Sequence, residues 1–168
     1  MTLLQRLRPD HAPALIAFER ENRAYFAASI PDRGDDYFAE FASRHNALLA
    51  DQEAGTLHFH VLADDDGAVL GRVNLVDVAG GSAELGYRIA ERAAGRGLAT
   101  AAVREVCELA VGEYGLITLT ARTTRDNGGS RTVLARTGFV ESGTITLMGK
   151  PGLCFDRDLT KPVGAAGH

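Results

Sequence analysis

Apolar residues recur along the chain with two different periods, and each period predicts a different kind of element. In the first third of the sequence they recur every three to four positions, as on the buried face of a helix. This spacing predicts helices over residues 9–30 and 35–50, with Leu15 and Phe41 on their buried faces. Pro31 limits the first helix, because a residue that precedes proline is driven out of helical geometry.

Elsewhere the pattern changes to runs in which apolar and polar residues alternate, as on half-buried strands. The predicted strands span residues 2–8, 56–63, 68–78, 82–90, 116–122, 139–148 and 153–159. Two further helices, over residues 100–111 and 130–137, separate the later strands. Antiparallel hairpins combined with a helical crossover predict an α/β (α+β) sandwich around a mixed central sheet.

Composition narrows the class of protein. The chain has 168 residues, of which 45% are hydrophobic, and this suits one domain, expected over residues 1–161, with a flexible tail over 162–168. A formal net charge of -4 argues against a nucleic-acid partner. Cys107 and Cys154 form no C-x-x-C pair, which predicts a reducing, cytoplasmic setting. No apolar run approaches the roughly 20 residues of a membrane span, so no membrane partner is expected.

The most informative segment is Gly95-Arg-Gly-Leu-Ala-Thr100, which lies between a predicted strand and a predicted helix. Glycines allow a tight turn and a close approach to a ligand, and the helix start offers unpaired N–H groups. Together these features predict a pyrophosphate site formed by Gly95, Gly97, Leu98, Ala99 and Thr100. Arg92 and Arg96 could add positive charge there. A plain strand-to-helix turn is the alternative.

This segment resembles motif A of the GNAT acetyltransferases, Q/R-x-x-G-x-G/A, placed on Ala94-Gly-Arg-Gly-Leu-Ala99. Ala94 departs from the family's Gln or Arg. The alternative alignment, Arg92-Ala-Ala-Gly-Arg-Gly97, restores the arginine but misplaces the helix. About thirty residues later, Asn127-Gly-Gly-Ser130 followed by Thr137-Gly-Phe139 is similar to the family's N-x-x-S/A…GF block. The Glu84-Leu-Gly-Tyr87 strand and Ser130 resemble most closely the Rim-type branch, whose members acetylate protein N-termini or small amines. The resemblance covers roughly residues 69–158.

The resemblance implies a fold and a cosubstrate. The sheet would be largely antiparallel, flanked by helices, with its fourth and fifth strands splayed apart. Acetyl-CoA would lie between these strands and pair with the backbone near Ile89, and Asn127 and Ser130 would lie close to it. For Asn127, an ordinary Asn-Gly turn is the alternative. No metal is expected, because His58 and His60 alternate on one strand without a convincing third ligand.

Two residues are candidates for acid–base chemistry. Glu84 is predicted to be the general base that deprotonates the acceptor amine, with an exposed or ion-paired strand residue as the alternative. Ser130 is predicted to protonate the leaving thiolate, because Leu134 stands where many family members have tyrosine. Its alternative role is a helix N-cap.

The acceptor is expected to be a primary amine, either a peptide N-terminus or a small molecule. Aromatic and charged residues near the end of the first helix and beyond it predict the acceptor site, together with two residues of the strand at 82–90. The predicted acceptor-binding residues are Asn22, Tyr25, Phe26, Arg33, Glu84 and Tyr87. A monomer and a homodimer both remain open. The alternative function is a non-catalytic acyl-CoA-binding sensor, supported by Ala94 and by the missing tyrosine.

Overall fold

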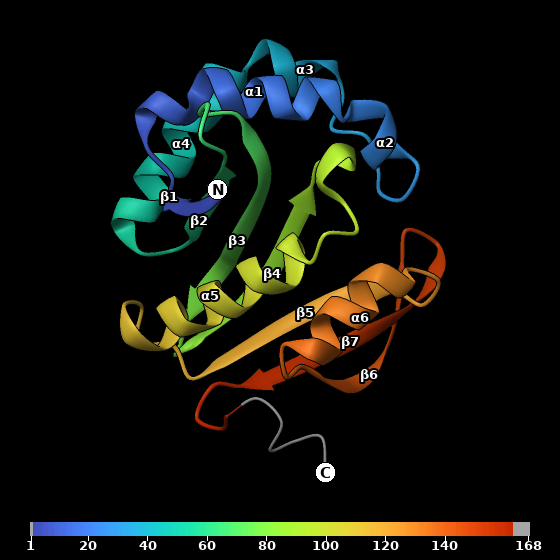
Figure 1. The fold of residues 1–168 in the computed structure, drawn as a ribbon. Helices are drawn as coiled ribbons and strands as arrows, with labels where there is room; N and C mark the ends of the chain where they lie inside the picture. The colour runs from blue at the N-terminus through green and yellow to red at the C-terminus, as the bar shows by residue number, and fades with distance from the viewer. Residues whose placement is uncertain (1, 163–168) are drawn as a thin grey trace.

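Residues 2–162 are described by a computed structural model, and their strands form one seven-stranded sheet (Figure 1). The strands are β1 (Leu3–Arg6), β2 (His58–Ala63), β3 (Val69–Ala79), β4 (Ser82–Ile89), β5 (Thr118–Thr124), β6 (Val140–Leu147) and β7 (Lys150–Asp158). Their order across the sheet is β1-β2-β3-β4-β5-β7-β6. All neighbours run antiparallel except β4 and β5, which run parallel. The predicted mixed, largely antiparallel sheet is confirmed.

The fourth and fifth strands splay, as the resemblance implied. Their pairing comprises Ser82 with Thr118, Ala83 with Leu119 and Glu84 with Thr120. Beyond Glu84 the two strands diverge, and Figure 1 shows the V-shaped opening between them. The described part of the chain thus has a sheet that is open at its centre.

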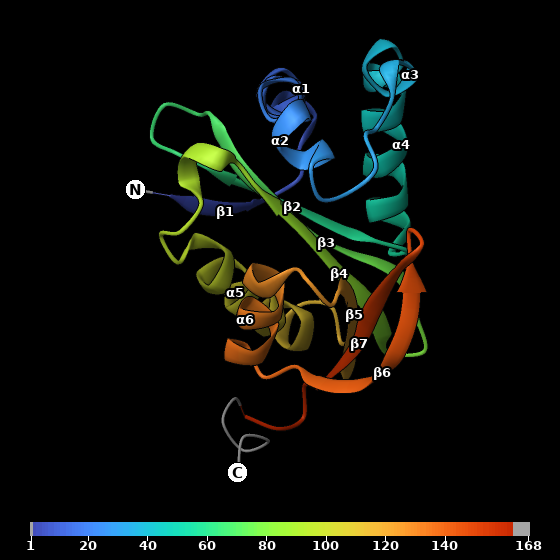
Figure 2. The same ribbon diagram turned by 90° about the vertical axis from the view of Figure 1, so that its right-hand side faces the viewer.

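Helices cover both faces of this sheet (Figure 2). On one side lie α5 (Leu98–Gly112) and α6 (Gly128–Arg136), and on the other lie α1 (Ala12–Glu21), α2 (Arg23–Ala27), α3 (Asp35–Ala39) and α4 (Phe41–Ala54). Short 3-10 helices, η1 (Pro9–His11) and η2 (Glu91–Ala93), precede α1 and the glycine loop. The apolar stripe of α5 is buried: Ala102, Val103, Val106 and Ala110. None of the helices in residues 2–162 has the length and apolar character needed to traverse a bilayer.

Each of the two predicted N-terminal helices is broken in the structure. The first breaks at Asn22, where the side-chain amide donates to the carbonyl of Phe18 at 2.9 Å. Such a local side-chain bond competes with helical hydrogen bonding. The second breaks at Glu40, whose φ of -102° and ψ of 14° leave helical geometry. Apart from Pro162, the predicted tail at 162–168 lies outside the described residues.

A buried cluster of charges fastens α1 to the sheet. The Glu19 carboxylate is 1% exposed and accepts from Arg72 at 2.7 Å, from Arg33 at 3.1 Å and from Arg88 at 3.3 Å. Burial alone would raise the pKa of Glu19, but the three guanidinium groups outweigh it and the pKa lies below its ordinary value. We name these four residues the Glu19 cluster. It joins α1, β3, β4 and the connection between α2 and α3.

The two histidines of β2 both contact Tyr114. His58 stacks on the Tyr114 ring with centroids 3.6 Å apart, and His60 Nε2 lies 2.6 Å from the Tyr114 hydroxyl. His60 Nδ1 lies 3.1 Å from the Val73 carbonyl, which can only accept, so Nδ1 carries the proton and Nε2 accepts from tyrosine. Within residues 2–162, no three His, Cys, Asp or Glu side chains are grouped to hold a metal ion.

The buried His60 makes stability depend on pH. Burial lowers the pKa of His60 to about 4, whereas an unfolded histidine titrates near 6.5. The unfolded chain therefore binds more protons between these values, and this group destabilises the fold as pH falls below 6.5. Between pH 7.5 and 5.5 we expect the wild type to lose about 1 kcal/mol more unfolding free energy than His60→Leu. Urea denaturation at both pH values measures this, and equal losses in the two proteins would contradict it.

Candidate active site

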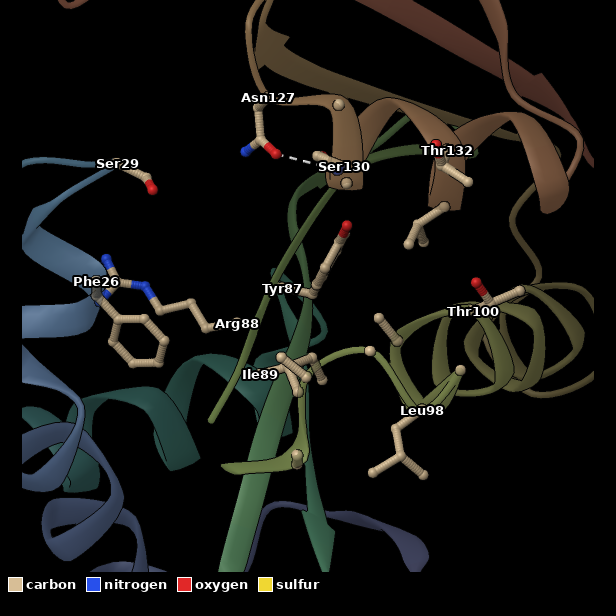
Figure 3. Close-up of a pocket in the computed structure, with 18 of the residues that line it drawn as sticks. Phe26, Ser29, Tyr87, Arg88, Ile89, Leu98, Thr100, Asn127, Ser130 and Thr132 are labelled. Carbon is tan, nitrogen blue, oxygen red and sulfur yellow. Dashed lines mark hydrogen bonds between the residues drawn. The ribbon is translucent and has the colours of Figure 1, made fainter. Parts of the chain in front are cut away.

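A cavity of about 570 Å³ lies at the open end of the V. Its walls are the end of β4, the glycine loop, the first turn of α5, the start of α6, and α2 with the residues that follow (Figure 3). Most predicted cofactor residues line it, namely Ile89, Gly95, Gly97, Leu98, Ala99, Thr100, Asn127 and Ser130. Three predicted acceptor residues, Tyr25, Phe26 and Tyr87, line it as well. The sequence therefore identified residues that the fold brings together from five separate segments.

The glycine loop supplies unpaired backbone donors to this cavity. Gly95 and Gly97 have φ angles of 75° and 74°, a left-handed conformation that few residues other than glycine adopt easily. Gly97 precedes α5, which has no side-chain N-cap. The N–H groups of Leu98, Ala99 and Thr100 therefore lack a partner within their own helix. This arrangement suits a phosphate group, which accepts such bonds and is attracted to the positive end of a helix.

The diverging strands leave a second set of backbone groups available. On its β3 side, β4 is paired from Ser82 through Ile89, but its pairing with β5 ends at Glu84. The backbone from Leu85 to Ile89 is thus without a strand partner on the β5 side. An extended ligand carrying amide groups can add to such an edge as a further strand. The pantetheine arm of CoA has amides of this kind.

The start of α6 places Ser130 at the cavity and leaves its hydroxyl free of a capping role. Asn127 is the N-cap of α6, and its side-chain oxygen accepts from the Ser130 N–H at 3.1 Å. The N-cap alternative for Ser130 is therefore wrong, and so is an ordinary turn for Asn127. Capping is performed by Asn127, and the Ser130 hydroxyl remains available.

Tyr87 lies beside Ser130. Its hydroxyl points toward the start of α6, as Figure 3 shows. Burial raises the pKa of Tyr87, and a side-chain hydrogen bond with Ser130 partly opposes this rise. Two hydroxyl groups from different elements therefore line the same cavity.

A smaller cavity of about 190 Å³ adjoins the first and extends into the V. The two cavities share Ser29, Ile30, Tyr87, Asn127 and Ser130. The far wall of the smaller one comes from 121–124 on β5 and from Leu147 and Met148 at the β6–β7 turn. Sequence reasoning missed this wall, because no motif marks it and only the sheet order brings β5 and the β6–β7 turn to the V.

Five predicted site residues lie elsewhere. Arg92 and Arg96 line neither cavity, and Arg96 instead donates to the Arg92 carbonyl at 3.3 Å. Asn22 is buried, where its side-chain oxygen accepts from the Glu91 N–H at 2.9 Å and joins α1 to η2. Arg33 belongs to the Glu19 cluster and stacks on Tyr37.

Glu84 is the fifth of these residues. It lines a separate hollow of about 360 Å³ together with Cys154, and it lines neither of the two connected cavities. Its carboxylate is paired with Arg122, whose Nε donates to Oε1 at 2.8 Å. The ion-paired alternative describes Glu84 in this structure. Arg122 itself lines the smaller cavity, so it connects Glu84 to that cavity's rim.

Comparison with known proteins identifies acetyltransferases as relatives of this chain. Residues 2–140 match the family model described as Acetyltransferase (GNAT) domain. "Probable N-acetyltransferase YjcK" of Bacillus subtilis (strain 168) is 29% identical over 137 residues, which cover 76% of this chain and 74% of that protein.

Two solved structures share the fold. The ribosomal-protein-S5-alanine acetyltransferase of Vibrio fischeri superposes with a TM-score of 0.90 at 18% identity, covering 96% of each chain. Mycobacterium smegmatis RimJ in complex with CoA-disulfide gives a TM-score of 0.85 at 24% identity, covering 99% of this chain and 86% of that one. At these identities the likeness establishes the fold alone.

Proposed function

The chain belongs to the GNAT acetyltransferase family, and we propose that it transfers an acetyl group from acetyl-CoA to a primary amine. One observation carries the proposal. The glycine loop, the unpaired edge of β4 and the Ser130 hydroxyl all border one cavity at the splayed strands. That cavity continues into a smaller one along the splayed strands. The unpaired Cys107 and Cys154 fit a reducing, cytoplasmic setting.

The two ends of the larger cavity suit the two parts of acetyl-CoA. We assign the pyrophosphate to the N–H groups of Leu98, Ala99 and Thr100, which need an acceptor. We assign the pantetheine arm to the free edge of β4 near Ile89. The positive charge predicted from Arg92 and Arg96 is not needed, because backbone donors and the helix dipole already favour an anion.

Acetyl-CoA supplies an activated thioester, whose carbonyl carbon forms a bond with the amine nitrogen while its bond to sulfur breaks. We propose that the Ser130 hydroxyl donates the proton that converts the departing thiolate to a thiol, and that Ser130 is reprotonated by water that carries the proton lost by the amine. Tyr87 lines the same cavity and points toward the start of α6, and we assign to it the orientation of that hydroxyl. A donor fixed before the reaction stabilises the developing negative charge at little reorganisation cost.

Glu84 remains our proposal for the base, acting at a distance. The acceptor amine must lose a proton before or during attack. Glu84 does not reach the cavities directly, so the proton would pass through water beside Arg122, which lines the smaller cavity.

A glutamine substitution tests the base. If Glu84 accepts the proton of the amine, Glu84→Gln should shift or flatten the rise of kcat/KM with pH. A profile of unchanged shape and height would remove Glu84 from the mechanism.

A matched pair of glycine substitutions tests the phosphate site. Gly97 and Gly55 have φ angles of 74° and 81°, and an added Cβ would meet no atom within 4 Å at either position. Gly97→Ala and Gly55→Ala should therefore cost similar backbone strain, about 1–2 kcal/mol. Only Gly97→Ala should weaken acetyl-CoA binding, by roughly tenfold, because its Cβ lies where the ligand approaches. Isothermal titration calorimetry measures the affinity of each variant for acetyl-CoA. Equal affinities of Gly97→Ala and Gly55→Ala would contradict the assigned phosphate site.

A serine substitution tests the proton donor. We expect Ser130→Ala to lower kcat on the order of a hundredfold, the usual size of a positioned acid's contribution. Acetyl-CoA affinity and the melting temperature should change little, because Asn127 caps α6. Ser43→Ala, an exposed substitution on α4, is the matched control. Release of free CoA thiol measures the rate. A parallel fall of rate and affinity would contradict the role, whereas binding without turnover for any amine would favour the sensor alternative.

A further inference from the structure

Every charged side chain that lines the two connected cavities is an arginine. Among residues 2–162, Arg88 and Arg136 line the larger cavity, Arg122 lines the smaller one, and no aspartate or glutamate lines either. A site for a polycationic amine would need carboxylates to offset the cost of removing its charges from water. The lining of these cavities carries positive side chains instead.

Arg88 is the arginine among these that shares its carboxylate partner with two other guanidinium groups. Its side chain is 18% exposed, and Nη1 donates to Glu19 Oε1 at 3.3 Å, the longest bond in the Glu19 cluster. Glu19 also pairs with Arg72 at 2.7 Å and with Arg33 at 3.1 Å. One carboxylate thus serves three guanidinium groups, which leaves a local excess of positive charge beside the cavity.

The remaining surroundings of Arg88 reinforce this excess. Burial lowers the pKa of Arg88 to about 10, with the charges of Arg33 and Arg72 adding to the effect and Glu19 opposing it. The guanidinium lies 5.1 Å from the centre of the Phe26 ring, and among the described residues its hydrogen-bond acceptor is Glu19, reached through one of its five N–H groups. An anion placed there would gain charge-assisted hydrogen bonds in a partly buried site.

The position of Arg88 assigns this anion to the acceptor. In Figure 3 Arg88 lies beside Phe26 and below Ser29, while Leu98 and Thr100 lie on the other side of the cavity. The phosphates of the cosubstrate are assigned to the Leu98–Thr100 side. Tyr87, the neighbour of Arg88 in β4, lines the same cavity as Ser130, where the reaction is proposed to occur. The Arg88 side chain borders this cavity on the side away from the glycine loop.

We propose that the acceptor is a primary amine that also carries a carboxylate, and that Arg88 binds this carboxylate. The proposal rests on the acetyl transfer proposed above and adds the chemical class of the acceptor. The carboxylate can belong to an acidic side chain next to a peptide N-terminus or to the free carboxyl group of a small amino acid. In both cases the shared chemistry is an amine and a carboxylate separated by a few bonds. Polyamines and aminoglycosides are disfavoured, because they would bring further cations to an arginine-lined site.

Matched acceptors test this in the wild-type protein. Four Ala-X-Ala-Ala amides, with X as Asp, Asn, Lys or Glu, differ only in the second side chain, and the amidated end removes the terminal carboxylate. Ala-Ala and Ala-Ala amide separate the free carboxyl source from the side-chain source. We expect kcat/KM to be on the order of tenfold higher for the Asp peptide than for the Asn peptide, or for Ala-Ala than for its amide. The Lys peptide should be the poorest acceptor.

Two variants assign the preference to Arg88. Arg88→Gln should bring the carboxylate-to-amide ratio close to one, whereas Arg44→Gln, an exposed arginine of α4 that lines neither cavity and lies outside the Glu19 cluster, should keep it. Melting temperatures check folding, and the wild-type ratios stand even if Arg88→Gln unfolds. Turnover with no carboxylate preference, or with a preference for lysine or spermidine, would overturn this inference and leave the acetyl transfer intact. No turnover with any acceptor, although acetyl-CoA binds, would overturn the transferase proposal and this inference with it.

Discussion

The early end of the pairing between β4 and β5 is the constraint on which the site depends. Backbone N–H and C=O groups in a sheet require partners, and here the parallel pairing ends at Glu84 and Thr120. The remaining length of β4 therefore presents a free edge inside the protein. The glycine loop follows β4 after the short η2 and α6 follows β5, so both helix starts converge on the opening. One local divergence thus brings the edge, the two helix starts and the cavities together.

The Glu19 cluster is the second organising interaction, because it fixes the N-terminal helices relative to the opening. Arg72 comes from β3, Arg88 from β4 and Arg33 from the connection that follows α2. Buried charges are costly unless they are paired, so the cluster holds these segments in one arrangement. It also carries more positive than negative charge, and the surplus faces the acceptor side of the cavity. The contacts that fix the fold therefore also set the electrostatic character proposed for the acceptor site.

Sequence reasoning predicted what depends on local pattern. The alternation of apolar and polar residues over 82–90 located β4, and the two short motifs located the glycine loop and the start of α6. Sequence reasoning failed for residues whose role is determined by tertiary contacts. Asn22 looked like a helical residue near an acceptor loop, but its side chain bonds to Phe18 and to Glu91, sixty-nine residues away along the chain. The arginine partners of Glu19 could not be predicted either, because they are distant from it in the sequence. The wall formed by β5 and the β6–β7 turn has no motif and follows only from the strand order.

Hydrogen–deuterium exchange with and without acetyl-CoA tests the central claim most directly, namely that the splayed edge and the glycine loop form the cosubstrate site. The account predicts that acetyl-CoA slows amide exchange at Leu85–Ile89 and at Leu98–Thr100, with α4 unchanged as an internal reference. Binding that protects other segments and leaves these two unchanged would contradict it.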